Sequence, residues 1–163
     1  MWVGRGIVRA GRAVTFTLIA LGWTVSAAAR DVALISNKAN HVETISWPDL
    51  VKICKAQTNR WPDSKPVTLV IRDPASTEMK LVLQKIYEMP REDVVALIAS
   101  ANHDRQNHPA IVMADSDEVV VKKVESTPGA VGLVDVYAIT GGVTVVRVGG
   151  KLPLEPGYVL HGN

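Results

Sequence analysis

The sequence predicts an α/β fold in which a mixed, mostly parallel sheet carries helices on both faces. Short, nearly continuous apolar runs recur along the chain, and such runs are typical of strands buried on both faces. Longer stretches with helical spacing separate most of these runs. Strands that alternate with helices build a largely parallel or mixed sheet. The predicted order of elements is β–α–β–α–α–β–α–β–β.

The first strand and the first helix follow from residues 32–54. Val32–Ser36 is an apolar run with the length of a buried strand. Ser46 is a good N-cap, and Pro48 falls in the first helical turn, where its missing N–H costs nothing. The helix that follows has one apolar stripe, made of Leu50, Ile53 and Cys54.

The middle of the chain predicts one strand and two helices. Val67–Ile71 is a second apolar run, and Ser76 has the position of an N-cap for the next helix. A further helix begins at Met89-Pro90. Each helix has one core-facing stripe: Met79, Val82, Leu83 and Ile86 in the first, and Val94, Leu97, Ile98 and Ala101 in the second.

The last third predicts three strands and one helix. A polar loop over residues 102–109 leads to a short strand, Ile111–Ala114, and Asp115 or Ser116 caps the next helix. Pro128-Gly129 ends that helix. The final strands are Ala130–Val136 and Val143–Val148, joined through a turn at Gly141-Gly142, and the tail beyond them is irregular.

Residues 1–29 have the three parts of a cleavable signal peptide. Arg5, Arg9 and Arg12 form a basic start, residues 13–25 are uncharged and mostly apolar, and three alanines end the segment. A membrane anchor is the alternative, but about 20 apolar residues are needed to span a bilayer. We expect cleavage after Ala29, which leaves residues 30–163 as a single domain in the periplasm or outside the cell.

The charge of the chain differs between leader and domain. The whole chain has a formal net charge of +2, but three of its 18 basic residues lie in the leader, so 15 remain against 16 acidic residues, a net of −1. No basic run is interleaved with aromatic residues, so a nucleic-acid partner is not expected. Cys54 is the only cysteine, which excludes an intrachain disulfide, and it is expected to be a buried apolar residue.

One segment predicts a binding site for an anion. Arg72 follows the strand Val67–Ile71, and Ser76 and Thr77 come just before a predicted helix. Ligands of open α/β sheets bind outside the carboxyl ends of the strands, and a helix N-terminus offers free N–H groups to an anion. We therefore name Arg72, Ser76 and Thr77 as candidate oxyanion ligands. The competing interpretation is that Ser76 only caps the helix and Arg72 pairs with a nearby carboxylate.

Other candidates for chemistry are weaker. His103 and His108 flank Asp104 in a polar loop, and their spacing matches no closed metal set. No G-x-S-x-G motif is present, and no nucleophile is placed next to a base. We expect no catalytic residue, metal or cofactor, and therefore no enzyme.

Several stretches, taken in order over residues 32–136, resemble the periplasmic phosphate-binding proteins. The opening of that family resembles Val32–Asn37 followed by Ile45–Ile53, and its W-x-D-G segment resembles Arg60–Ser64. Its R-x-x-x-S-G-T loop resembles Arg72–Thr77, and its P-G-A-I-G-Y-V strand resembles Ser126–Val134. The loop of this chain lacks the glycine, so Thr77 matches either the Gly or, with a gap, the Thr. Without a gap, Glu78 takes the place of the Thr.

The resemblance implies one lobe of a type 2 periplasmic-binding-protein fold. Such proteins bind phosphate or a similar oxyanion for an ABC importer, between two lobes that close on the ligand. Carried over to this sequence, Arg72, Ser76 and Thr77 match ligand contacts. The implied partners are a small oxyanion and an envelope transporter or sensor. The alternative function is an envelope interaction module that keeps the fold and binds no ligand.

Overall fold

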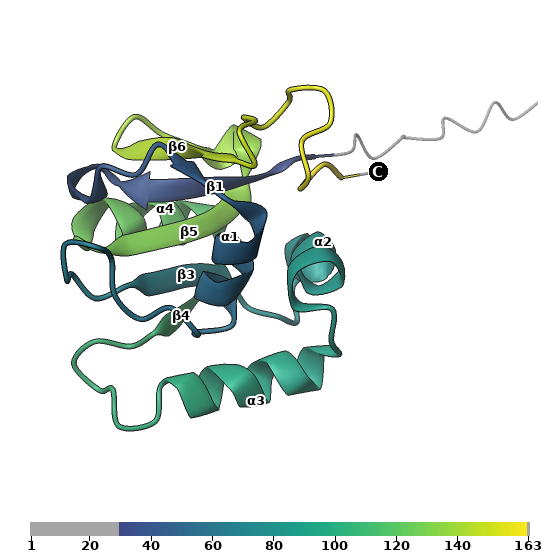
Figure 1. The fold of residues 1–163 in the computed structure, drawn as a ribbon. Helices are drawn as coiled ribbons and strands as arrows, with labels where there is room; N and C mark the ends of the chain where they lie inside the picture. Colours follow the sequence, from purple (N-terminus) through teal and green to yellow (C-terminus); the bar gives the residue numbers. More distant parts are fainter. Residues whose placement is uncertain (1–29, 163) are drawn as a thin grey trace, which may run out of the picture.

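The computed structural model describes residues 30–162, which form a six-stranded sheet with helices on both faces (Figure 1). The strand order across the sheet is β2-β6-β1-β5-β3-β4. Strand β3 is parallel to both β4 and β5, and β2 is parallel to β6, whereas β1 is antiparallel to its neighbours β5 and β6. The prediction of a mixed, mostly parallel sheet is confirmed. The strands are β1 (Val32–Asn37), β2 (Thr44–Ile45), β3 (Thr68–Arg72), β4 (Ile111–Ala114), β5 (Ala130–Asp135) and β6 (Val143–Val148).

The helices begin largely where the sequence predicts. In α1 (Trp47–Cys54) the Ser46 hydroxyl accepts a hydrogen bond from the backbone N–H of Asp49, and in α4 (Asp117–Ser126) Ser116 does the same for Val119. Helix α3 covers Arg91–Ala101. The predicted leader lies outside the described residues. Within residues 30–162, no helix is long and apolar enough to cross a membrane.

The helix predicted after Ser76 is irregular. It begins as a 3₁₀ turn (η2, Thr77–Met79), continues as a single α turn (α2, Lys80–Val82) and ends as a wider π turn (η3, Leu83–Tyr87). Ile86 and Tyr87 are both buried in this last turn. The predicted helical segment is therefore present, and its predicted stripe faces the core, but its turns are not those of one regular α-helix.

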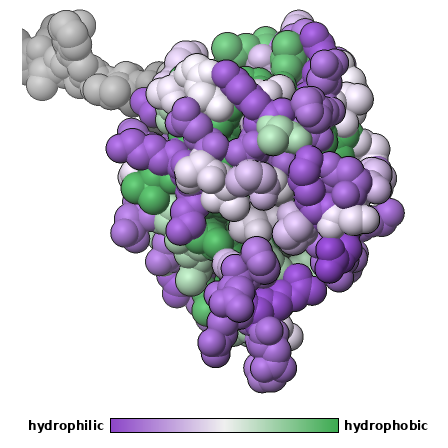
Figure 2. Space-filling view, turned by 90° about the vertical axis from the view of Figure 1, so that its left-hand side faces the viewer, coloured by the Kyte–Doolittle hydropathy of each residue, from purple (hydrophilic) through white to green (hydrophobic). Residues whose placement is uncertain are grey.

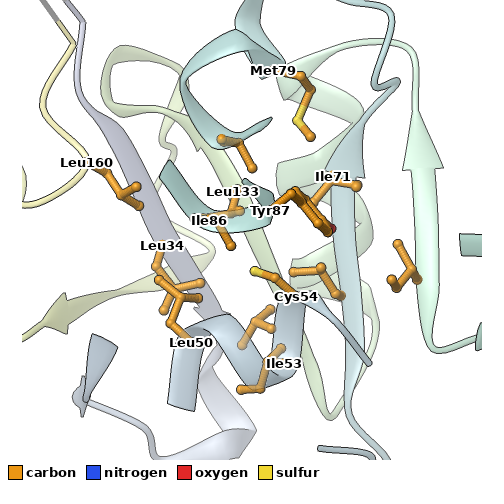
Figure 3. Close-up of a cluster of buried hydrophobic side chains, with 14 of the residues drawn as sticks. Leu34, Leu50, Ile53, Cys54, Ile71, Met79, Ile86, Tyr87, Leu133 and Leu160 are labelled. Carbon is orange, nitrogen blue, oxygen red and sulfur yellow. The ribbon is translucent and has the colours of Figure 1, made fainter. Parts of the chain in front are cut away.

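Two apolar cores lie on opposite faces of the sheet. Helix α4 covers one face with Val120, Val121 and Val124, as predicted. The other face carries the larger core, which includes α1 and the irregular helix (Figure 3). Burial raises the pKa of the Cys54 thiol in this core to about 12. Cys54 is therefore a packing residue, in agreement with the sequence.

The surface is mainly polar on the face shown in Figure 2, where apolar side chains form small separate patches. Among the described residues, five large apolar side chains are exposed: Val95, Met113, Val119, Tyr137 and Leu154. Scattered apolar side chains of this kind are ordinary on a folded surface.

Candidate functional site

Arg72 is the last residue of β3, at the carboxyl edge of the sheet. Its side chain is only 17% exposed and lies between two carboxylates. Nη2 is 3.4 Å from Oε2 of Glu78, and Nη1 is 3.6 Å from Oδ1 of Asp117. The interpretation that Arg72 pairs with nearby carboxylates is therefore confirmed, although an ion pair of this kind does not exclude a ligand.

Asp117 reaches this site because of the strand order. Strands β3 and β4 are parallel neighbours, with Arg72 paired to Ala114, so the segments that follow them lie at the same edge. Asp117 is the first residue of α4 and is 8% exposed. Burial raises the pKa of its carboxyl, against the opposing effect of the Arg72 guanidinium. We did not identify Asp117 from the sequence, because its distance from Arg72 depends on which strands are neighbours.

The loop after Arg72 is built by Asp73. Its carboxylate accepts a hydrogen bond from the Ala75 N–H at 2.7 Å, and its carbonyl accepts one from the Ser76 N–H at 2.8 Å. These two bonds turn the chain directly after β3 and fix where Ser76 and Thr77 begin the irregular helix.

The three candidate ligands are not all brought together. Arg72 and Thr77 line one pocket, together with Glu78, whereas Ser76 does not line it. Ser76 has the extended backbone of an N-cap, but its side chain makes no cap hydrogen bond. Its Oγ is buried, and so is Nε of Arg72, and neither has a hydrogen-bond partner within residues 30–162. The expected capping bond of the Ser76 hydroxyl is therefore not formed in the described residues.

The pocket has a volume of about 640 Å³ and opens where β3 and β5 end. Seven charged residues line it, four acidic and three basic, which gives a net charge of −1. Arg30 and Asp135 form an ion pair of 3.1 Å across one side. The charged lining residues are Asp31, Glu78, Asp117 and Asp135 on the acidic side and Arg30, Arg72 and Lys80 on the basic side.

The histidine loop forms a different, polar hollow at the far end of the strands. It is lined by Asp104, Arg105 and His108, among others, and His103 has a side chain that is 79% exposed. Within the part of the chain that the structure describes, no group of three or more His, Cys, Asp or Glu residues could hold a metal ion.

Comparison with known proteins gives matches at the level of structure. No family model and no curated protein matches the sequence. Among the solved structures, an ABC-type phosphate transport receptor from Vibrio cholerae superposes with a TM-score of 0.66 at 16% identity, over 82% of this chain and 54% of that one. PstS from Borrelia burgdorferi gives a TM-score of 0.63 at 15% identity, over 83% and 55% of the two chains. A phosphate-binding protein from Stenotrophomonas maltophilia gives a TM-score of 0.57 at 18% identity, over 77% of this chain and 40% of that one.

The chain has the fold of these phosphate-binding proteins. It spans about half the length of the Vibrio and Borrelia proteins, and 40% of the Stenotrophomonas protein. The prediction of one lobe of a periplasmic-binding-protein fold is thus confirmed at the level of fold.

Proposed function

We propose that this chain is an extracytoplasmic, phosphate-binding-protein-like domain that binds phosphate or a similar oxyanion for ABC-type transport or for sensing. The observation that best supports anion binding is the position of Arg72, which lines a pocket at the carboxyl edge of the sheet. This is where open α/β sheets bind ligands, and the solved structures of the same fold are named as phosphate-transport or phosphate-binding proteins. Thr77 offers a hydroxyl in the same pocket. Ser76 would contribute only after its buried Oγ is exposed to the pocket.

Replacing Arg72 tests the binding. We expect isothermal titration calorimetry of the purified protein with phosphate and with sulfate to show binding, and Arg72→Ala to weaken it by about tenfold to a hundredfold, since a hydrogen bond to a charged group contributes about 1.5–3 kcal/mol. Arg105→Ala is the matched control, because Arg105 lines the other hollow. Heat from neither anion, or equal affinity in the Arg72→Ala variant, would contradict anion binding at this site.

A second function is favoured by the carboxylates around Arg72. Glu78 and Asp117 already neutralise the guanidinium, and the pocket as a whole is acidic. In this alternative the chain is a protein-interaction module of the cell envelope that has kept the fold and binds no anion. The same titration distinguishes the two functions, and capture of a transporter or sensor subunit from envelope extracts would then support the module.

We also propose that residues 1–29 direct export and are removed after Ala29. The small residue at the end of the leader is what signal peptidases require. We expect the protein recovered from the periplasm of a Gram-negative host to have the mass of a chain that begins at Arg30. Ala29→Arg is expected to block this cleavage while Ala29→Ser leaves it intact, and recovery of the uncut chain from the wild type would contradict the proposal.

A further inference from the structure

Glu78 is the more exposed of the two carboxylates that pair with Arg72. Its side chain is 50% exposed, whereas the side chains of Arg72 and Asp117 are 17% and 11% exposed. It comes from the 3₁₀ turn η2, while Asp117 comes from the first turn of α4, so the two acids approach the guanidinium from different elements. Of the two, Glu78 is therefore the one that can leave Arg72 without a change in a long helix.

The Glu78 contact uses a donor that an anionic ligand would need. Glu78 accepts a hydrogen bond from Nη2 of Arg72 at 3.4 Å, and Asp117 lies beside Nη1. Nε of Arg72 is buried without a partner among the described residues. Both terminal nitrogens of the guanidinium thus already face carboxylates, so a bound oxyanion competes with these carboxylates for the guanidinium.

From this arrangement we propose that Glu78 is an internal competitor that sets the affinity of the Arg72 pocket for oxyanions. The inference rests on the proposed function, and it adds the residue that determines how tightly the ligand is held. With Glu78 on the guanidinium, an oxyanion competes with it for the same Nη2 donors. The freed carboxylate then stays in the same pocket and repels the ligand, because like charges a few ångströms apart interact strongly at a partly buried site. Asp117 stays beside Nη1 in both states and holds the orientation of the guanidinium.

Neutralising Glu78 tests the proposal. We expect Glu78→Gln to bind inorganic phosphate at least tenfold more tightly than the wild type in isothermal titration calorimetry. Glu88→Gln is the matched control: it makes the same change of charge at the exposed residue that caps the end of the same irregular helix, outside the pocket, and is expected to leave the affinity unchanged. The Arg72 Nε–H resonance in ¹H–¹⁵N spectra is expected to shift in Glu78→Gln and to remain in place in Glu88→Gln.

The outcomes separate this inference from the proposed function. Equal phosphate affinity of wild type and Glu78→Gln, with binding lost in Arg72→Ala, overturns the role of Glu78 and leaves the anion site standing. An equal gain in Glu88→Gln also overturns it, because the gain then reflects net charge alone. Absence of phosphate binding in every variant, Glu78→Gln included, overturns both the competitor and the anion-binding function.

Discussion

Replacing Gly129 by alanine is expected to lower the free energy of unfolding by about 3 kcal/mol or more, or to leave the chain unfolded. Gly129 has a φ of +89°, which side-chain-bearing residues rarely adopt. A Cβ built on it would lie 2.2 Å from the backbone carbonyl oxygen of Pro66, which no side-chain rotation can relieve. The free-energy costs of the strained backbone and of the clash therefore add to each other.

Gly129 is also fixed by hydrogen bonds that prevent it from moving away. Its N–H donates to Oδ1 of Asn40 at 2.7 Å, and its carbonyl accepts from Nε1 of Trp61 at 2.9 Å. The same carbonyl accepts from the N–H of Thr68, the first residue of β3. A shift that relieved the clash would break contacts to three separate segments.

Gly149→Ala is the control for the backbone cost alone. Gly149 has a φ of +59°, and nothing lies within 4 Å of the position of its missing Cβ. We expect Gly149→Ala to lower the free energy of unfolding by about 1–2 kcal/mol, the usual penalty for a side-chain-bearing residue in this conformation. Urea unfolding followed by circular dichroism measures both variants, and equal losses would show that the contact with Pro66 contributes nothing.

The sequence predicted this turn but not its reason. Residue type alone indicates a helix stop at Pro128-Gly129, and α4 ends at Ser126, just before it. The close approach of Pro66 arises because the start of β5 lies beside the start of β3. Such contacts depend on strand order, which local patterns do not contain.

The same limit applies to the site. The apolar runs predicted the long strands closely, whereas β2 was missed, since two residues in a polar stretch become a strand only by pairing with β6. Arg72 was placed correctly at a strand end, but Asp117 lies 45 positions further along the chain, and only the pairing of β3 with β4 brings it near. The irregular turns after Ser76 were missed because tertiary packing decides them.

Asn37 ends the strand that opens the family resemblance, and the structure gives it a structural role. Its amide NH₂ donates to the carbonyls of Val124 and Glu125 at 2.9 and 2.8 Å, near the end of α4. Its Oδ1 accepts from the N–H of Ala39, and the residue is 6% exposed. One buried side chain therefore joins the end of β1 to the last turn of α4, where helix carbonyls lack partners within the helix.

Asn37→Asp is the second large effect that we expect, with a loss of about 3 kcal/mol in the free energy of unfolding at neutral pH. The substitution keeps an oxygen for Ala39 but sets a second carboxylate oxygen against the carbonyls of Val124 and Glu125. Burial and these oxygens favour the neutral acid, so its pKa in the folded state is raised above the unfolded value. The unfolded chain then binds fewer protons than the folded one, and the loss shrinks as the pH falls through the folded pKa.

Asn37→Ala separates the charge from the lost hydrogen bonds. It removes the Asn37 donor from both helix carbonyls, of which that of Val124 keeps a bond from the Thr127 N–H, at a cost of about 1–3 kcal/mol that does not depend on pH. Urea unfolding of both variants at neutral and acidic pH is the measurement. A difference between the two variants that persists unchanged at acidic pH would contradict the argument, because the extra loss in Asn37→Asp comes from an ionised carboxylate facing the end of α4.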